Sequence, residues 1–254
     1  MMDINNGIIK TVASLAMKKR RDEEGLFTAE GTKCVRDTWH HFRCRWLIAT
    51  RTWYEQLGTA EHYDKIVLAT RQQMARMSQF STPSDVIAVY EIPNIEIDAQ
   101  EVKNGLNIVL DNIQDPGNLG TIIRIADWFG VNNIFASKGT VDVYNHKVVQ
   151  ATMGAISRVK VHYCNLEYLF QDFPDVPVFG TFLSGENIYQ AELPEAAFVV
   201  MGNEGQGISP KVASLVQRRL LIPAARRKGD ASESLNVSTA TAITVSEFFR
   251  RGIK

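Results

Sequence analysis

Hydrophobic and polar positions follow two different patterns along the chain. Between Ile8 and Ala16, apolar residues recur at helical spacing and predict an amphipathic helix. Short apolar runs then predict four strands, which are Leu26–Ala29, Trp46–Ala49, Ile66–Ala69 and Val86–Tyr90. The stretches Lys33–Phe42 and Arg71–Met77 lie between them and are long enough for helical turns. The first part of the chain therefore predicts a small α/β unit.

A polar segment separates this unit from the rest of the chain. Ile92–Gly105 is rich in acidic residues and contains both Pro and Gly, which is typical of a linker between two cores. We therefore expect two domains, comprising residues 1–98 and residues 99–254.

From Leu106 onward the pattern becomes regular. Apolar runs alternate with helix-like segments, which predicts a parallel sheet covered by helices, an α/β fold. The predicted strands are Asn107–Leu110, Asn133–Ala136, Arg158–Tyr163, Val178–Phe182, Ala197–Met201 and Leu220–Ile222. A last helix over Glu233–Arg250 is apolar around much of its circumference, so we expect most of it to be buried.

Composition excludes several protein classes. At 254 residues, with 45% hydrophobic and 22% charged residues, the chain is neither disordered nor fibrous. No apolar run approaches the roughly 20 residues that span a bilayer, and Met1–Lys10 lacks the features of a signal peptide, so we expect a cytoplasmic protein. The three cysteines include no CxxC pair, and we expect buried free thiols.

The formal net charge is zero, but basic residues cluster in two places. Residues 10–51 contain ten bases and five acids, and residues 211–230 contain six bases and one acid. In the first patch, Lys18–Arg21 is followed by acids that could pair with it along a helix. In the second, Arg226–Lys228 fall in a loop containing Gly and Ser, where no helix explains the clustering.

Polar side chains follow several strands of the second pattern, at the edge where ligands gather in open parallel sheets. Asn118 and Arg124 follow the first strand, Glu204 lies in the loop GNEGQG, and Ser234 and Asn236 precede the last helix. Simpler roles exist, because Asn118 and Ser234 could cap helices and Glu204 could be solvated. Arg124 lies in the apolar stretch TIIRIADWF, where an unpaired charge is costly, so we expect an anionic or hydrogen-bonding partner.

Other chemistries are not indicated. The chain has no GxxxxGK[ST] loop, which argues against a P-loop NTPase, and no GxSxG motif of serine hydrolases. The five histidines show no HExxH or HxxxH spacing, so no metal is expected. GNEGQG has glycines in a different order from the dinucleotide fingerprint and lacks its context.

Three segments in succession resemble the motifs of one enzyme family. DPGNLGTIIRIADWFG, FVVMGNEGQGIS, and LLIP with ESLNVSTATAI resemble the motifs of SpoU/TrmH-type RNA ribose 2′-O-methyltransferases of the SPOUT superfamily, in the same order. The resemblance covers Leu106 to Arg250, and the first part of the chain is similar to the RNA-substrate-binding domain found in many members. The loop PAARRKGDASES is longer and more basic than its counterpart in the family.

The resemblance implies a deep trefoil knot in the second domain, with S-adenosylmethionine bound in it. By motif position, the residues that contact this cofactor are Thr181, Leu183, Gly202, Gly205, Ile222 and Leu235. Glycines allow the backbone to approach a ligand closely, and Ile222 and Leu235 suit the faces of an adenine ring. The resemblance also implies a homodimer, with the last helix packing across the interface.

The same motif positions imply a catalytic set of Asn118, Arg124, Glu204, Ser234 and Asn236. A guanidinium group has a pKa above about 12 and is a poor general base. We therefore interpret Arg124 as a group that binds a substrate phosphate and orients the 2′-hydroxyl, with Ser234 and Asn236 holding Arg124 in place. Glu204 is expected to position neighbouring groups such as Asn118. The proton acceptor is not assigned.

RNA is the expected partner. The candidate RNA-binding residues are basic side chains of the two patches, namely Lys18, Lys19, Arg20, Arg21, Arg226, Arg227 and Lys228. Ribosomal RNA is favoured over transfer RNA, because the first domain resembles those of ribosomal enzymes. The alternatives are a transfer-RNA methyltransferase, a catalytically silent RNA-binding protein, and another nucleotide-dependent α/β enzyme. Glu204 inside the glycine loop disfavours the last of these, because it would repel phosphates.

Overall fold

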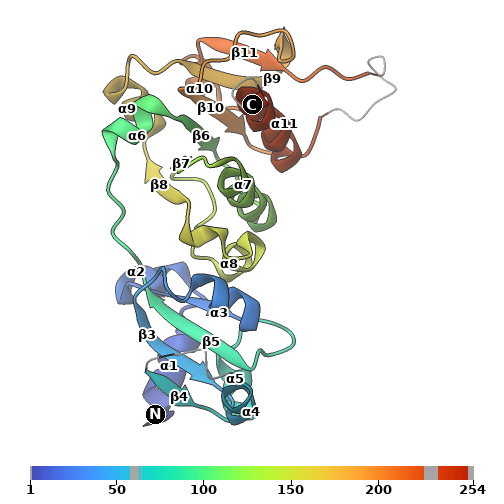
Figure 1. Cartoon of the computed structure of the whole chain (residues 1–254). Helices are drawn as coiled ribbons and strands as arrows, with labels where there is room; N and C mark the ends of the chain where they lie inside the picture. The colour runs from blue at the N-terminus through green and yellow to red at the C-terminus, as the bar shows by residue number, and fades with distance from the viewer. Residues whose placement is uncertain (1, 58–62, 64, 226–233, 251–254) are drawn as a thin grey trace. The chain divides into compact units, whose positions relative to one another are not determined.

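A computed structural model describes residues 2–57, 63, 65–225 and 234–250. The chain forms two compact units (Figure 1). The first comprises Met1–Asn94 and Asp142–Ser157, and the second comprises Ile95–Val141 and Arg158–Lys254. The chain thus passes from one unit to the other near the expected linker, but it also returns once. Residues 142–157 were expected in the second domain, whereas they belong to the first unit of the structure.

The first unit contains a five-stranded mixed sheet in the order β1-β4-β3-β5-β2. β1, β4 and β3 are parallel, and β5 runs antiparallel to both β3 and β2. All four predicted strands are present, and a short β1 adds to them. The strand bounds are β1 Met2–Asp3, β2 Leu26–Glu30, β3 Cys44–Ala49, β4 Ile66–Leu68 and β5 Val86–Glu91.

Helices cover both faces of this sheet. On one face, α1 (Asn6–Ser14) and α5 (Arg71–Met77) pack together over a core that includes Val89 of β5. On the other face, α3 (Thr32–Thr38) places Thr38 Oγ1 3.0 Å from the hydroxyl of Tyr90, the next residue along the strand. The remaining helical segments of the unit are α2 Lys18–Glu24, α4 Arg51–Glu55, α8 His146–Thr152 and a 3₁₀ turn Ala155–Ser157.

Arg21 is buried, which corrects its assignment as an RNA-binding residue. Its side chain is 3% exposed. Its guanidinium donates to the carbonyls of Leu15 and Ala16 and, at 2.6 Å, to Oδ2 of Asp142. A buried arginine with this many partners cannot reach a phosphate. The pair is not predictable from the sequence pattern, because Asp142 lies 121 residues further along the chain.

The other three candidate RNA-binding residues of α2 are exposed but paired. Lys18 contacts Asp22 at 2.8 Å and Arg20 contacts Glu23 at 2.7 Å, both along α2. Lys19 lies 3.8 Å from the same Glu23. The helical pairing considered for this patch is therefore present. Exposed pairs of this kind contribute only about 0.2–1 kcal/mol and can open to admit another partner.

The second unit is built on a six-stranded sheet in the order β11-β9-β10-β6-β7-β8. Every neighbouring pair is parallel, as the alternating pattern predicts. The strand bounds are β6 Leu106–Asp111, β7 Asn133–Ser137, β8 Lys160–Cys164, β9 Val178–Asn187, β10 Ala197–Gly202 and β11 Arg218–Leu221.

Two layers of helices cover this sheet. On one face, α6 (Ala99–Asn104), α9 (Leu166–Asp172) and α10 (Pro210–Ala213) contribute to a core with β6, β7 and β10. On the other face, α7 (Pro116–Phe129) and α11 (Val237–Arg250) pack together (Figure 1). The predicted linker therefore contains a helix, α6, which begins after the cap Asp98 and buries Val102.

The last helix begins at Val237 rather than Glu233, because Asn236 accepts hydrogen bonds from the backbone N–H groups of Ser238 and Thr239 and so forms the cap. Its interior residues, including Thr241 and Thr244, are buried within this one chain. The apolar circumference therefore reflects packing inside the unit and does not by itself require a second copy. Residues 226–233 lie outside the described residues, and the trefoil knot remains a prediction.

The expectation of buried thiols holds for one cysteine. Cys34 is buried, whereas Cys44 and Cys164 are half-buried, and none forms a disulfide. Burial raises the pKa of Cys34 to about 11, with the charges of Asp37 and Glu30 adding to the effect. In the part of the chain that the structure describes, no helix has the length and apolar character needed to cross a membrane.

Candidate active site

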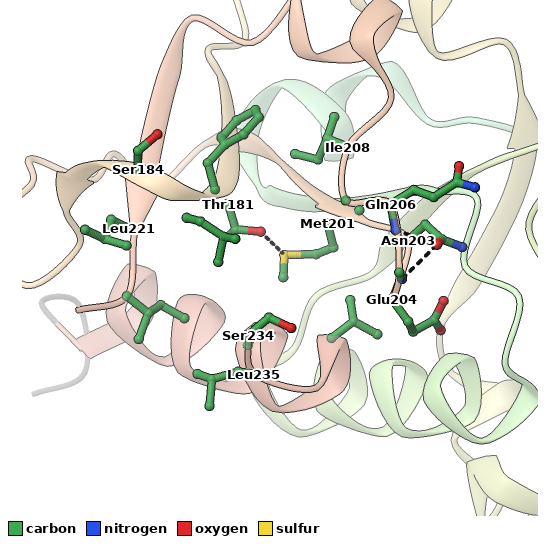
Figure 2. Close-up of a pocket in the computed structure, with 18 residues that line it drawn as sticks. Thr181, Ser184, Met201, Asn203, Glu204, Gln206, Ile208, Leu221, Ser234 and Leu235 are labelled. Carbon is green, nitrogen blue, oxygen red and sulfur yellow. Dashed lines mark hydrogen bonds between the residues drawn. The ribbon is translucent and has the colours of Figure 1, made fainter. Parts of the chain in front are cut away.

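A cavity of about 640 Å³ lies in the second unit, at the carboxyl ends of β10 and β11 and beside the middle of β9. Its walls come from the segment after Gly180, the loop after β10, the end of β11 and the start of α11. Figure 2 shows Thr181 and Met201 at its centre, with Asn203 and Glu204 on one side and Leu235 on another. Its volume falls in the roughly 300–1,000 Å³ range of small-molecule sites.

An interruption in strand pairing creates one wall of the cavity. Arg219 of β11 pairs with Gly180 of β9, but the next residue, Leu220, pairs with Glu186. Residues 181–185 therefore bulge out of the ladder, and four of them line the cavity. At the end of the bulge, a Cβ on Gly185 would lie 2.4 Å from the carbonyl oxygen of Arg219, so only glycine permits this approach.

The glycine loop after β10 forms the opposite wall. Asn203 and Gly207 exchange backbone hydrogen bonds of 2.9 and 3.0 Å, which closes the loop on itself. Asn203 Oδ1 also accepts from the N–H groups of Gly205 and Gln206. A Cβ on Gly202 would lie 2.2 Å from backbone atoms across the loop. Gly202 is therefore required for the loop's shape, whatever the cavity binds.

Polar groups at the end of β6 support this loop through hydrogen bonds. Asn203 Nδ2 donates to the carbonyl of Asn112 at 2.7 Å, and the buried carboxylate of Asp111 accepts from the N–H of Ser209 at 2.8 Å. Asn112 has a positive φ of 59°, a conformation that asparagine tolerates. None of these supporting residues was predicted from the sequence. The only signal was the run of polar residues directly after two predicted strands.

All of the residues expected to contact S-adenosylmethionine line the cavity; they are Thr181, Leu183, Gly202, Gly205, Ile222 and Leu235. Leu183 is 76% exposed and Leu235 is 49% exposed, which is unusual for large apolar side chains and leaves them available to a ligand. Apolar walls beside a backbone loop held open by glycines fit an adenosine group. The residues present therefore fit this cofactor.

Three of the expected catalytic residues form a hydrogen-bonded chain beside the cavity. Asn236 Nδ2 donates to Asn118 Oδ1 at 2.9 Å, and Asn118 Nδ2 donates to Glu204 Oε1 at 2.9 Å. Because the carboxylate accepts only, it sets the orientation of both amides. The three side chains come from α7, the glycine loop and the cap of α11, so this chain of bonds joins three separate elements.

The other two expected catalytic residues are placed differently. Ser234 lines the cavity and is exposed, and it forms no hydrogen bond within the described residues. Arg124 is exposed on the outer face of α7 and is not among the cavity-lining residues. It has no hydrogen bond or ion pair to any part of the chain that the structure describes. The described residues supply no such partner, because the side chain is solvated rather than buried, and the expected anionic or hydrogen-bonding partner of Arg124 stays a prediction.

Of the basic residues that follow or belong to β11, the structure describes only some. Arg226, Arg227 and Lys228 lie outside the described residues. Arg219 lies with its guanidinium 4.5 Å from the ring centre of Phe182, a cation–π contact that orients one wall residue. Among the described residues, no group of three or more His, Cys, Asp and Glu side chains could hold a metal ion.

Comparison with known families gives two matches that together span most of the chain. Residues 105–246 match the SpoU rRNA Methylase family. Residues 6–88 match the MRM3-like substrate binding domain. The first match contains the cavity walls on β9 and β10, the hydrogen-bonded chain and Arg124.

Individual proteins are similar over nearly the whole length. The chain is 29% identical to the 23S rRNA (guanosine(2553)-2′-O)-methyltransferase RlmP of Bacillus subtilis over 245 residues, which cover 94% of this chain and 95% of that protein. A solved structure from Porphyromonas gingivalis, assigned to the TrmH family of RNA methyltransferases, is 39% identical with a TM-score of 0.86, covering 98% and 99% of the two chains. An AdoMet-bound rRNA methyltransferase from Sinorhizobium meliloti is 28% identical with a TM-score of 0.83, covering 100% and 98%.

Proposed function

The chain belongs to the SpoU rRNA methylase family, and from that premise we propose that it methylates a ribose 2′-hydroxyl of ribosomal RNA. It is an RNA methyltransferase with S-adenosylmethionine as its methyl donor. The observation that carries the proposal is the hydrogen-bonded chain Asn236–Asn118–Glu204 at the rim of a cavity with apolar walls.

The cavity binds the methyl donor, and the polar residues at its rim face the RNA substrate. When bound, S-adenosylmethionine supplies an electrophilic methyl group on a positively charged sulfur. The glycine loop and the bulge at residues 181–185 hold the donor, while the polar chain and Ser234 face the side from which an RNA hydroxyl approaches. Ser234 has no bond to the described residues, so its hydroxyl is available to hydrogen-bond an RNA oxygen.

Arg124 acts on the substrate rather than the donor. Its guanidinium binds an RNA phosphate, orients the 2′-hydroxyl and stabilises the negative charge that develops on the attacking oxygen. Exposure and the lack of an internal partner leave its donors available for this task. A guanidinium remains protonated during catalysis, so it does not accept the hydroxyl proton.

We further propose that the active protein is a homodimer in which each copy supplies Arg124 to the cavity of the other. In one chain, Arg124 lies six residues beyond Asn118, on a different side of α7, and does not line the cavity. One turn further, Trp128 is 85% exposed, and an exposed tryptophan is typical of an interface. Light scattering of the active protein tests this; a stable 28.5 kDa species with full activity would contradict it.

The choice of ribosomal RNA is supported by two observations. The amino-terminal residues 6–88 match a substrate-binding domain, and relatives similar over most of the chain act on 23S rRNA. The test uses a host strain lacking the gene, whose ribosomal and transfer RNA are incubated separately with the purified protein and radiolabelled S-adenosylmethionine. Nuclease digestion then identifies the methylated nucleoside. We expect a 2′-O-methyl nucleoside from ribosomal RNA; a methylated base, or label in transfer RNA alone, would contradict the proposal.

A further inference from the structure

A second cavity, of about 540 Å³, lies in the first unit and is lined by none of the residues assigned above to methyl transfer. Its polar wall contains Thr50 and Arg51, which follow β3, and Thr70, Arg71 and Gln73, which follow β4. Asp3 of β1 completes this wall. The cavity therefore lies at the carboxyl ends of three parallel strands. We call it the β3–β4 crevice.

The chain path explains why a crevice forms there. After β3, helix α4 joins the face occupied by α3, where Trp53 Nε1 donates to Thr32 Oγ1 at 2.8 Å. After the adjacent strand β4, helix α5 joins α1 on the opposite face. Neighbouring parallel strands whose connections leave for opposite faces create an open gap at their carboxyl ends, and such gaps are where α/β sheets bind ligands.

The charged groups of the crevice favour a phosphate. Arg51 and Arg71 come from the two sides of the gap, and their side chains are 73% and 81% exposed. Among the described residues, they form long ion pairs with Glu55 and Asp85, at 3.9 and 3.8 Å, which is beyond hydrogen-bonding distance. Within the described residues, both guanidinium groups therefore retain their N–H donors for an external acceptor.

The remaining wall residues favour a nucleotide over a simple anion. The carboxylate of Asp3 repels phosphate but accepts hydrogen bonds from ribose hydroxyls and base amino groups. The hydroxyls of Thr50 and Thr70 each accept a backbone N–H of the following helix, which holds both threonines in place beside the arginines. A ligand that carries both phosphate and hydroxyl groups can bind the arginines and the carboxylate of Asp3 at the same time.

We propose that the β3–β4 crevice binds a nucleotide of the RNA substrate, with its phosphates held by Arg51 and Arg71. The inference rests on the proposed function in taking the partner to be RNA. It adds a contact surface distinct from the basic residues of α2, two of which form closer ion pairs with acids of their own helix. The crevice contributes to substrate binding and takes no part in the chemical step.

The experiment measures binding of the full chain to deproteinised ribosomal RNA from a strain lacking the gene, over a range of KCl concentrations. The crevice variant carries Arg51→Gln and Arg71→Gln. The matched control carries Arg43→Gln and Arg45→Gln, which remove the same charge from exposed residues beside the opposite end of β3. Melting temperatures of all proteins establish that each variant is folded.

Two lost phosphate contacts should lower the slope of log affinity against log salt by about 1.4, which corresponds to about 25-fold weaker binding at roughly 0.1 M salt. The control should keep the wild-type slope. A variant with Arg51→Lys and Arg71→Lys retains the charge and should recover most of the slope. Equal slopes for the crevice variant and the control would overturn the proposal.

Two further readouts separate the alternatives. Titration with guanosine monophosphate tests whether the crevice takes a free nucleotide; binding of this probe that depends on both arginines, with RNA binding unchanged in the variant, would overturn the RNA assignment. Methylation of the same RNA is measured in parallel. If the wild type binds this RNA without methylating it, the proposed function fails. The crevice proposal is then still tested by the slope of log affinity against log salt in the crevice variant and the control. If the wild type does not bind the RNA, both proposals fail.

Discussion

Arg124→Ala tests the assignment of this residue to the substrate side of the reaction. Arg124 is exposed and has no hydrogen bond or ion pair to the described residues, and it does not line the cavity. Substitutions at such positions change the free energy of unfolding by no more than about 0.5 kcal/mol. We therefore expect an unchanged melting temperature and an affinity for S-adenosylmethionine within a few-fold of the wild type.

The effect on methyl transfer should be far larger. Removal of one positioned donor that stabilises developing negative charge lowers kcat by about 10²–10³, or roughly 2.7–4 kcal/mol of activation free energy. Single-turnover methylation of saturating RNA measures this step, and titration calorimetry measures cofactor affinity separately. Lys103→Ala is the matched control, because it removes an exposed cation from a helix of the same unit away from the cavity.

Two results would refute this reasoning. Loss of S-adenosylmethionine binding in Arg124→Ala would make the residue part of the donor site, and a kcat within threefold of the control would remove it from the chemistry. Arg124→Lys adds a finer test. Lysine keeps the charge but not the planar fork of donors, so we expect it to restore RNA affinity more fully than kcat.

Three further outcomes follow from the structure. Arg21→Met should lower the free energy of unfolding in urea by about 3–5 kcal/mol, because it leaves the carboxylate of Asp142 without its buried partner. Asp142→Asn should lower the free energy of unfolding less in the Arg21→Met background than in the wild type. Gly202→Ala should weaken S-adenosylmethionine binding by about 10- to 100-fold in calorimetry, since its methyl group clashes with the loop, whereas Gly205→Ala has room within the chain and should leave the loop intact. Burial raises the pKa of Glu30 above its ordinary value of 4.5, so ionisation disfavours the folded state. The melting temperature of the wild type minus that of Glu30→Gln should therefore decrease as the pH rises above about 4.5, and a difference that does not change with pH would contradict the assignment.

Periodicity predicted the parts of the fold that depend on apolar burial. All ten predicted strands occur, and the second sheet is parallel throughout. Its central strands β6, β7 and β10 are buried on both faces and appear as continuous apolar runs in the sequence. The cofactor contacts came from family motifs, and the structure gathers them around one cavity. Spacing alone did not place them together.

Features that depend on distant or local polar contacts were not predictable in this way. The Arg21–Asp142 pair joins residues 121 positions apart, and nothing in either neighbourhood marks it. The predicted strand ends at Phe182, whereas β9 continues to Asn187, and the bulge at residues 181–185 arises from the register of β11, which the sequence pattern does not show. Helix α6 has a single buried residue, Val102, so its apolar signal is weak.

The return of residues 142–157 to the first unit limits how the two units can be exchanged between relatives. This segment contributes Val148, Val149 and Ile156 to the interior of a unit formed mainly by residues 1–94. A recombinant protein joined at residue 94 would inherit these side chains from one parent and their packing partners from the other. Substitutions on the two segments must therefore be compatible, and a productive chimera has to transfer both together. The amino-terminal unit is thus not a detachable module, although its main segment ends at a single linker.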